Sequence, residues 1–342
     1  MSMQGYSTAP SRNLIRAEQA MLSHAEPIIV LGNFGTQQEQ PLNKTDTVVF
    51  RRVNPFNMQS NGTPGIVANQ FVLAEGTTPN SNSITYTDVS VTLQQYGILF
   101  KFSSKVEAMY EDDIPSDMAT LTGETLAEVA ELVRYGAVKA GTNVIYANGA
   151  SRAAVNTVIS LNRLRSTARA LENARAKMVT QRLATGVNFG TQPVEPGYIV
   201  FIHTDVESDV RNLPGFTKTV EYAQFKPVHE REIGSVERFR FITSPLLAPF
   251  LGAGSNTLNG CLSQGAANVD VYPVIVMAQE AWGQVALKGM GAVQPTILPA
   301  KQKNHANPLG QFGYVGANFW TASVRLNENW MARLEVGVSS LA

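Results

Sequence analysis

Residues 46–103 constrain the fold most, because they contain two strand patterns with little hydrophobic core of their own. The first pattern runs into Arg51 and Arg52, and turn-forming residues follow it at 54–65. A candidate strand at 66–76 and a further turn then lead into the second pattern. The whole stretch predicts a β-hairpin with a polar tip that projects from the rest of the chain. Because an isolated hairpin is only marginally stable in water, this one needs another surface to rest on.

The second strand pattern, in residues 83–97, changes its phase of alternation partway along. Its apolar side chains fall on one parity before Asp88 and on the other after it: Ile84 and Tyr86, then Val89, Val91 and Leu93. Because successive side chains of a strand point to opposite faces, the change at Asp88 predicts a bulge or a change of packing partner.

The strongest helix pattern lies at residues 117–147. Residues 111–131 include seven acids and no basic residue, and the next charges are Arg134 and Lys139. Acids at the start of a helix and bases near its end both stabilise the helix dipole. Such a helix would be roughly 45 Å long at 1.5 Å per residue, whereas an average helix has about 11 to 12 residues. The pattern therefore predicts a structural spine or a member of a bundle.

The rest of the chain carries elements of ordinary length. Residues 1–45 are irregular apart from a helix predicted over 11–24, and we interpret them as an extended arm. The other predicted elements are an amphipathic helix over 161–184, a buried strand over 198–203, a helix with a capping box of Thr204 and Glu207, a strand over 273–278 and a C-terminal hairpin over 319–338. The order of these later elements indicates a mixed α/β domain in the second half of the chain.

Charged residues are scarce, at 16% of the chain against about 25% in an average protein. The 27 basic and 27 acidic residues cancel, which argues against a strongly basic nucleic-acid-binding chain. A hydrophobic content of 44% excludes an acidic disordered chain. Two explanations remain open at this point: a globular protein with a Ser/Thr/Asn-rich surface, or a subunit whose surface is covered by its neighbours.

No motif in the sequence points to a cofactor, a metal ion or a membrane. The four histidines are far apart, no Walker motif or GxSxG is present, and no apolar run approaches the length of about 18 residues that spans a bilayer. The first residues lack a basic segment followed by an apolar one, so we expect no signal peptide. The single cysteine, Cys261, is expected to be a small buried hydrophobe.

Three charged features have both a functional and a structural explanation. His203 and Asp205 are the best catalytic candidates, but the end of a strand and the start of a capped helix explain them better. Adjacent acids at 112 and 113 suit acid–base chemistry, but their place before a long helix favours a dipole role. Residues 134–182 carry nine basic residues and one acid, which fits a surface for a polyanion or, as we prefer, a solvated helix face or intersubunit ion pairs.

Four segments carry a resemblance to a known family. They are TVVFRRVNPF (47–56), LAEGTTPNSNSITYTDVSVTLQQYG (73–97), AGTNVIYANG (140–149) with SRAA (151–154), and NPLGQFGYVGANFW (307–320). On these segments the chain resembles the HK97-type major capsid proteins of tailed phages, and most of all the major capsid family of N4-like phages.

The resemblance implies an α+β, HK97-like capsid fold. Its parts would be an N-terminal arm (1–46), an extended E-loop hairpin with flanking strands (47–103), a peripheral domain with a long spine helix (104–160), an axial α/β domain (161–300) and a C-terminal return to the peripheral sheet (301–342). In such proteins the E-loop reaches over a neighbouring subunit.

The resemblance also implies a non-enzymatic function in the virion. Copies would form hexamers and pentamers that close into an icosahedral head shell around double-stranded DNA, held without sequence specificity. Assembly would take place in the cytoplasm of the bacterial host. Separate scaffolding, portal and decoration proteins are candidate further partners whose existence the resemblance leaves open, and no cofactor or membrane is implied. The alternatives are an encapsulin-like cargo shell and, in a different class, a hydrolase that uses His203 and Asp205.

Six residues are candidates for contacts between subunits. They are Arg51, Arg52 and Tyr86 on the hairpin, and Glu111, Asp112 and Asp113 before the long helix. The specific hypothesis is that the two arginines pair with this acidic group on a neighbour.

Overall fold

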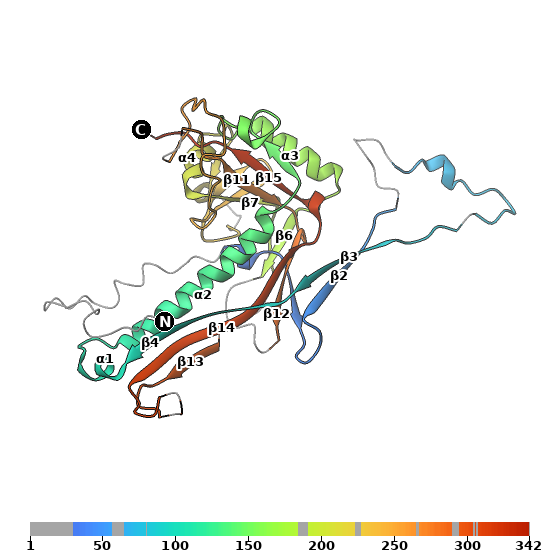
Figure 1. Ribbon diagram of the computed structural model, residues 1–342. Helices are drawn as coiled ribbons and strands as arrows, with labels where there is room; N and C mark the ends of the chain where they lie inside the picture. The colour runs from blue at the N-terminus through green and yellow to red at the C-terminus, as the bar shows by residue number, and fades with distance from the viewer. Residues whose placement is uncertain are drawn as a thin grey trace.

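Two β-sheets, a long helix and a projecting hairpin make up the computed structural model (Figure 1). The structure describes residues 30–56, 65–79, 81–183, 191–222, 227–264, 267–288, 294–303, 305 and 307–341. The helix predicted over 11–24 lies outside these residues.

The smaller sheet has five strands in the order β1-β12-β14-β13, with β4 paired to the other edge of β14. Its strands are β1 (Thr36–Gln40), β4 (Gln94–Ser103), β12 (Trp282–Leu287), β13 (Gln294–Leu298) and β14 (Phe312–Arg325). The β4–β14 ladder is antiparallel and runs from Phe312↔Ser103 to Thr321↔Gln94. The sheet therefore joins the middle of the chain to its C-terminal part.

The larger sheet has eight strands in the order β5-β15-β11-β7-β10-β9-β8, with β6 paired to β7. Its strands are β5 (Val144–Tyr146), β6 (Val179–Leu183), β7 (Thr191–Ile202), β8 (Thr217–Lys218), β9 (Glu232–Val236), β10 (Phe239–Thr243), β11 (Tyr272–Met277) and β15 (Met331–Val336). The predicted strands at 198–203 and 273–278 correspond to the end of β7 and to β11.

Apolar packing covers both faces of the larger sheet, which explains why its central strands are continuously hydrophobic. One face packs against Leu164 and Leu171 of α3 (Leu161–Asn173) and Val210 of α4 (Glu207–Arg211). The other face packs against Tyr135 and Val138 of α2 (Ile114–Lys139). The short helices are α1 (Ser104–Met109) and the 3-10 turns Leu31–Asn33, Ala68–Phe71, Arg152–Ala154, Thr204–Val206, Thr219–Glu221 and Glu328–Trp330.

The long helix α2 was predicted over 117–147 and spans Ile114–Lys139, 26 residues or about 39 Å at 1.5 Å per residue. It begins earlier because Asp113 is its N-cap, accepting a hydrogen bond from the Ser116 amide at 3.4 Å. It ends earlier because Val144–Tyr146 pairs with β15 instead of continuing the helix. Its N-terminal half packs on the five-stranded sheet through Leu126, and its C-terminal half packs on the larger sheet.

The predicted helix over 161–184 stops at Asn173, since the residues that follow form strand β6. Arg175, with φ of 55°, turns the chain between the two elements. The sequence pattern predicted one helix across this turn, because the pairing of β6 with β7 is a tertiary contact that a local pattern does not show.

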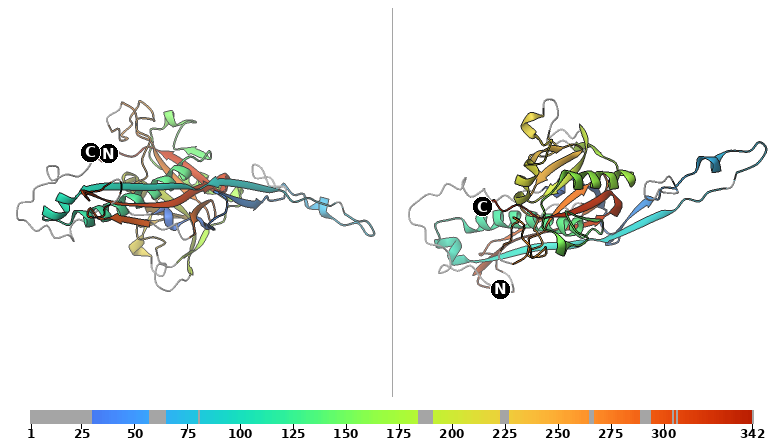
Figure 2. Two further views of the ribbon diagram at one scale, coloured as in Figure 1. Left: turned by 60° about the horizontal axis from the view of Figure 1, so that its bottom comes forward. Right: turned by 90° about the horizontal axis from the view of Figure 1, so that it is seen from above.

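The projecting hairpin consists of β2 (Thr47–Val53) and β3 (Tyr86–Thr92), paired from Thr47↔Thr92 to Val53↔Tyr86. Figure 2 shows from two further sides that residues 65–79, in the connecting segment of this hairpin, extend well beyond both sheets. The strand predicted at 66–76 is wrong: this part has only the 3-10 turn Ala68–Phe71, because the ladder ends at Val53 and Tyr86 and offers it no paired backbone. The bulge or change of packing partner predicted at Asp88 is wrong, because the β2–β3 ladder runs through Arg51↔Asp88 without a register shift. β3 gives way to β4 only at Leu93.

The C-terminal hairpin predicted over 319–338 is also wrong, because β14 and β15 belong to different sheets. β14 pairs with β4, β12 and β13, whereas β15 pairs with β11 and β5. Residues 301–342 therefore supply one strand to each sheet. Glu335 of β15 is fully buried, and its carboxylate accepts hydrogen bonds from Arg152 Nε and Nη2 at 2.7 and 2.8 Å.

Candidate subunit interface

Arg51 and Asp88 form an ion pair across the base of the hairpin. They lie directly opposite in the β2–β3 register, and Arg51 Nε and Nη2 donate to Asp88 Oδ1 and Oδ2 at 2.8 and 2.7 Å. The Arg51 guanidinium also lies 5.6 Å from the centre of the Tyr86 ring. The hydrogen bond from Arg51 holds the pKa of Asp88 below its usual value. Arg51 is thus paired within its own subunit.

Arg52 has a different environment, because successive side chains of a strand point to opposite faces. Its Nε and Nη1 atoms are buried and have no hydrogen-bond partner. It lines a recess of about 220 Å³ at the base of the hairpin, beside Glu280, Asn327 and Trp330. Leaving a buried donor unsatisfied costs about 1–3 kcal/mol, and more when the group is charged. Arg52 is therefore a cation that the isolated subunit leaves uncompensated.

The acidic candidates form a corner where α1 meets α2. Asp113 is occupied as the N-cap of α2. Glu111 is exposed and, among the described residues, its carboxylate has no hydrogen-bond or ion-pair partner. Figure 1 places this corner at the opposite end of the molecule from the hairpin. One subunit therefore does not bring the arginine and acidic candidates together.

The hairpin and its connecting segment expose a set of apolar side chains. Phe56 and Phe71 contact each other edge to face, with ring centres 6.3 Å apart. The exposed set is Val49, Val53, Phe56, Ile66, Val67, Phe71, Val72, Leu73, Ile84 and Tyr86. Exposed apolar side chains gathered on one projection are typical of an interaction surface. Sequence analysis treated this tip as polar, although the apolar run at 66–73 was the available signal.

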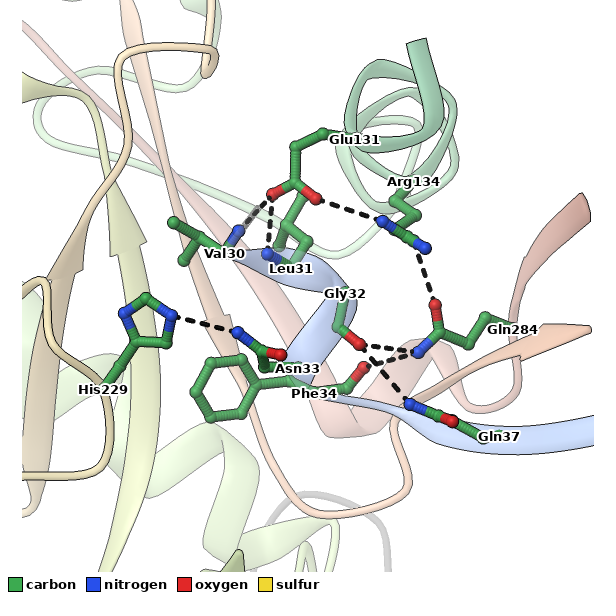
Figure 3. A network of polar contacts seen from close by, with 10 residues as sticks. All are labelled: Val30, Leu31, Gly32, Asn33, Phe34, Gln37, Glu131, Arg134, His229 and Gln284. Carbon is green, nitrogen blue, oxygen red and sulfur yellow. Dashed lines mark hydrogen bonds and ion pairs between the residues drawn. The ribbon is translucent and has the colours of Figure 1, made fainter. Parts of the chain in front are cut away.

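A buried carboxylate fixes the first described residues to α2 (Figure 3). Glu131 is fully buried, and its Oε1 accepts hydrogen bonds from the amides of Val30 and Leu31 at 3.0 and 2.6 Å. Its Oε2 lies 3.5 Å from Nη1 of Arg134. Val30 and Leu31 then pack into the core between α2 and the larger sheet. Sequence analysis counted Glu131 only as one of the helix acids and missed this anchor.

Gln284 connects the same anchor to the five-stranded sheet (Figure 3). Its Oε1 accepts from Arg134 Nε at 3.0 Å, and its Nε2 donates to the Gly32 carbonyl at 2.9 Å. Burial lowers the pKa of Arg134. Residues 30–34 are thus held from three sides: by helix α2, by strand β12 and by the core of the larger sheet.

The His203–Asp205 pair has a structural role in this geometry. His203 Nδ1 accepts a hydrogen bond from the Asp205 amide at 3.2 Å, so His203 caps the 3-10 turn Thr204–Val206. This cap replaces the predicted capping box of Thr204 and Glu207. Asp205 Oδ2 accepts from the Tyr272 hydroxyl at 2.7 Å. Within the described residues, no Ser, Thr or Cys side chain hydrogen-bonds His203, so no nucleophile accompanies the pair.

Other candidate chemistry is also accounted for by packing. Cys261 is buried, as expected, with Sγ 3.2 Å from the Asn156 carbonyl, and burial raises its pKa. The described ranges contain no His, Cys, Asp and Glu cluster that would hold a metal ion. No helix among them is both long and apolar enough to cross a membrane.

Some cations of the basic stretch at 134–182 are paired within the subunit. Arg152 binds Glu335, and Arg165 Nη2 lies 2.5 Å from Glu237 Oε1. These cations are paired with acids of the same chain, where solvated residues or intersubunit pairs were expected.

The base of the hairpin packs on the five-stranded sheet through Val48, but its extension exposes apolar side chains that the described residues of the subunit do not cover. An elongated α+β subunit with such an extension is typical of an assembly subunit. Sequence comparison then identifies the family: residues 85–297, more than half of the chain, match the model of a family described as phage capsid protein. The chain belongs to this family, and is a structural component of a phage virion. No curated protein is significantly similar to it in sequence.

Solved phage capsids share the fold. The capsid of Ralstonia phage GP4 matches with a TM-score of 0.62 and 12% identity, covering 90% of this chain and 88% of that one. The head structure of Helicobacter pylori bacteriophage KHP40 matches with a TM-score of 0.60 and 10% identity, covering 90% and 89%. The capsid of cyanophage P-SCSP1u matches with a TM-score of 0.57 and 13% identity, covering 92% and 90%. The expected HK97-like α+β capsid fold is confirmed.

Proposed function

We propose that this chain is the major capsid protein of a tailed phage, and that its copies form hexamers and pentamers of an icosahedral head shell. The observation that supports this most is the hairpin: it exposes apolar side chains on an extension that its own subunit does not cover. In the assembled shell, a neighbouring copy covers that surface. The enclosed double-stranded DNA is held without sequence specificity.

Assembly follows from placing different surfaces of one copy against the next. A contact between unlike surfaces repeats around an axis and closes into a ring when the rotation permits. Obligate interfaces of this kind often bury more than about 2,000 Å² in total. Their cores are depleted of charge, which fits the 16% charged residues of this chain.

We propose for the five segments the roles expected from the sequence. Residues 1–46 act as the arm, and 47–103 as the E-loop with its flanking strands. Residues 104–160 would form the peripheral domain around α2. Residues 161–300 would form the axial domain, except for β12 and β13, which lie in the same sheet as β14. Residues 301–342 return to the peripheral sheet through β14 and send β15 to the larger sheet.

Purification after expression in bacteria tests the proposal. Light scattering and negative-stain microscopy are expected to show rings or closed shells of the wild-type chain, alone or together with a scaffolding protein from the same phage. A chain that stays monomeric under both conditions would contradict it. Shells that hold a cargo protein and never DNA would favour the encapsulin-like alternative.

The remaining partners follow from the same proposal. A portal protein and decoration proteins would bind the shell, and assembly would occur in the host cytoplasm. The four quoted sequence segments support a relation to the major capsid proteins of N4-like phages. Mass spectrometry of purified virions is expected to find this chain as the most abundant protein; a minor copy number would contradict the role of major subunit.

A further inference from the structure

The structure shows that the two neighbouring arginines of the hairpin have different environments, which the sequence could not show. Arg51 is exposed and already holds Asp88 in a bidentate pair. Arg52 has two buried nitrogens without a hydrogen bond, while Nη2 is not among the buried atoms. A bidentate arginine–carboxylate pair is among the strongest of polar contacts. Arg52, rather than Arg51, is the group that gains from an added carboxylate.

The recess that Arg52 lines admits a side chain from outside. Its volume of about 220 Å³ lies between the hairpin base and the body, with apolar walls from Phe50 and Trp330. Glu280 also lines it, but is not within ion-pairing distance of Arg52. A narrow recess with apolar walls and one uncompensated cation suits the end of an acidic side chain better than a bulky ligand.

We propose that Arg52 receives the Glu111 carboxylate of a second copy of this chain, which rests on the proposed shell function. Glu111 is exposed on a protruding corner and is free of partners among the described residues, whereas Asp113 caps α2. Nearby acids at 107, 112, 113 and 117 add negative charge to the corner, which complements the cationic recess. In Figure 1, α1 and the start of α2 lie well apart from the β2–β3 ladder that carries Arg52, so the pair forms only between copies.

A charge-swap cycle tests the pair. Arg52→Glu and Glu111→Arg are each expected to lower the assembled fraction about tenfold or more, and the double swap to restore most of it. Light scattering and microscopy at fixed protein concentration measure that fraction. The control for Glu111→Arg is Glu128→Arg, which changes an exposed acid of α2. A second comparison sets the test variant Arg52→Gln against its control, Arg51→Gln. The controls Glu128→Arg and Arg51→Gln are expected to assemble as the wild type does.

Subunit stability shows whether a variant fails in folding or in assembly. Arg52→Gln removes an uncompensated cation, so the melting temperature of the dissociated subunit is expected to stay equal or to rise. Failed assembly with an intact subunit supports the proposal. Undiminished assembly of Arg52→Gln, or a double swap that assembles no better than the single variants, overturns it.

Cross-linking supplies a second readout that does not depend on charge. Arg52→Cys with Glu111→Cys, treated with a short bismaleimide, is expected to give covalent oligomers in the assembled sample; Arg52→Cys with Glu128→Cys is the control. The buried native Cys261 limits the background reaction. Assembled shells without these oligomers would refute the pair alone, whereas a wild type that never assembles would refute the proposed function.

Discussion

At the scale of single residues, the polar contacts that matter most are made by buried carboxylates. Glu131 accepts two backbone amides, and Glu335 binds Arg152 and Arg333. Both carboxylates are fully buried. Neither role was visible in the sequence, because the Leu31 amide is 100 positions from Glu131 and Arg152 is 183 positions from Glu335 along the chain. A local pattern identifies an acid on a helix or strand, but not the amide or cation that folding brings to it.

Removal of the Glu131 carboxylate tests the anchor of residues 30–34. Glu131→Ala is expected to lower the free energy of unfolding by about 2–4 kcal/mol, because two buried amides lose a charged acceptor and Arg134 loses its ion pair. Urea unfolding of the dissociated subunit measures the change. Glu128→Ala, an exposed site on the same helix, should stay within about 0.5 kcal/mol of the wild type. Equal values for the two variants would rule out the anchor.

The Arg51–Asp88 pair predicts a pH dependence at the hairpin base. The pKa of Asp88 is held below the usual value of about 3.9, so its charged form is favoured in the folded state. The stability from this pair is therefore present above pH of about 3.9 and is lost as the pH falls through the lowered pKa.

Carboxyl NMR titration checks that direction. The pKa of Asp88 should lie below the usual range in the wild type and return toward it in Arg51→Gln, since the hydrogen bond from Arg51 is the main cause of the shift. An unchanged titration of Asp88 in this variant would show that the pair does not form in solution.

At the scale of elements, the sequence predicted the helices and strands that depend on a local residue pattern. It failed for the segments whose structure depends on strand pairing. The hairpin base and the long helix follow from alternation, acidic residues at the helix start and apolar spacing. The segment at 66–76 has a strand-like composition, but no neighbouring backbone pairs with it. The stretch around Asn327 resembled a hairpin turn, yet it carries the chain from one sheet to the other through the 3-10 turn Glu328–Trp330.

The candidate interface shows the same division. All six residues were chosen from the sequence, but only the structure shows that Arg51 is paired, that Asp113 is a cap and that Arg52 is not compensated. Arg51 and Arg52 differ because they occupy opposite faces of strand β2 and because Phe50 and Trp330 line the recess beside Arg52.

Shortening the hairpin tests whether this element serves the subunit or its neighbours. Replacing residues 54–85 by a two-residue Asn-Gly turn keeps the β2–β3 ladder, because this turn suits a tight hairpin. The melting temperature of the subunit is expected to change by less than about 4 °C, since the described residues of the removed segment (54–56, 65–79 and 81–85) contribute no buried apolar side chain. Assembly into shells is expected to be lost. A shortened chain that still forms shells would show that the extension is dispensable.

At the scale of the whole molecule, the subunit is elongated and its two ends differ in chemistry. One end carries the extension of the hairpin with its exposed apolar side chains, and the other carries the acidic corner (Figure 2). The Arg52 recess lies between them, at the base of the hairpin. Such a molecule can bury its exposed apolar side chains and pair its charges in contacts between unlike surfaces of successive copies. Contacts of this type favour rings and closed shells. The low charge of the sequence, which first allowed two explanations, fits a surface that neighbours cover.

Electron cryomicroscopy of the assembled particle tests the central claim most directly. We predict a closed shell of repeating subunits in which residues 65–79 of each hairpin lie on another copy and the Arg52 recess is filled. Particles in which these hairpins extend into solvent, or fold back onto their own subunit, would contradict it.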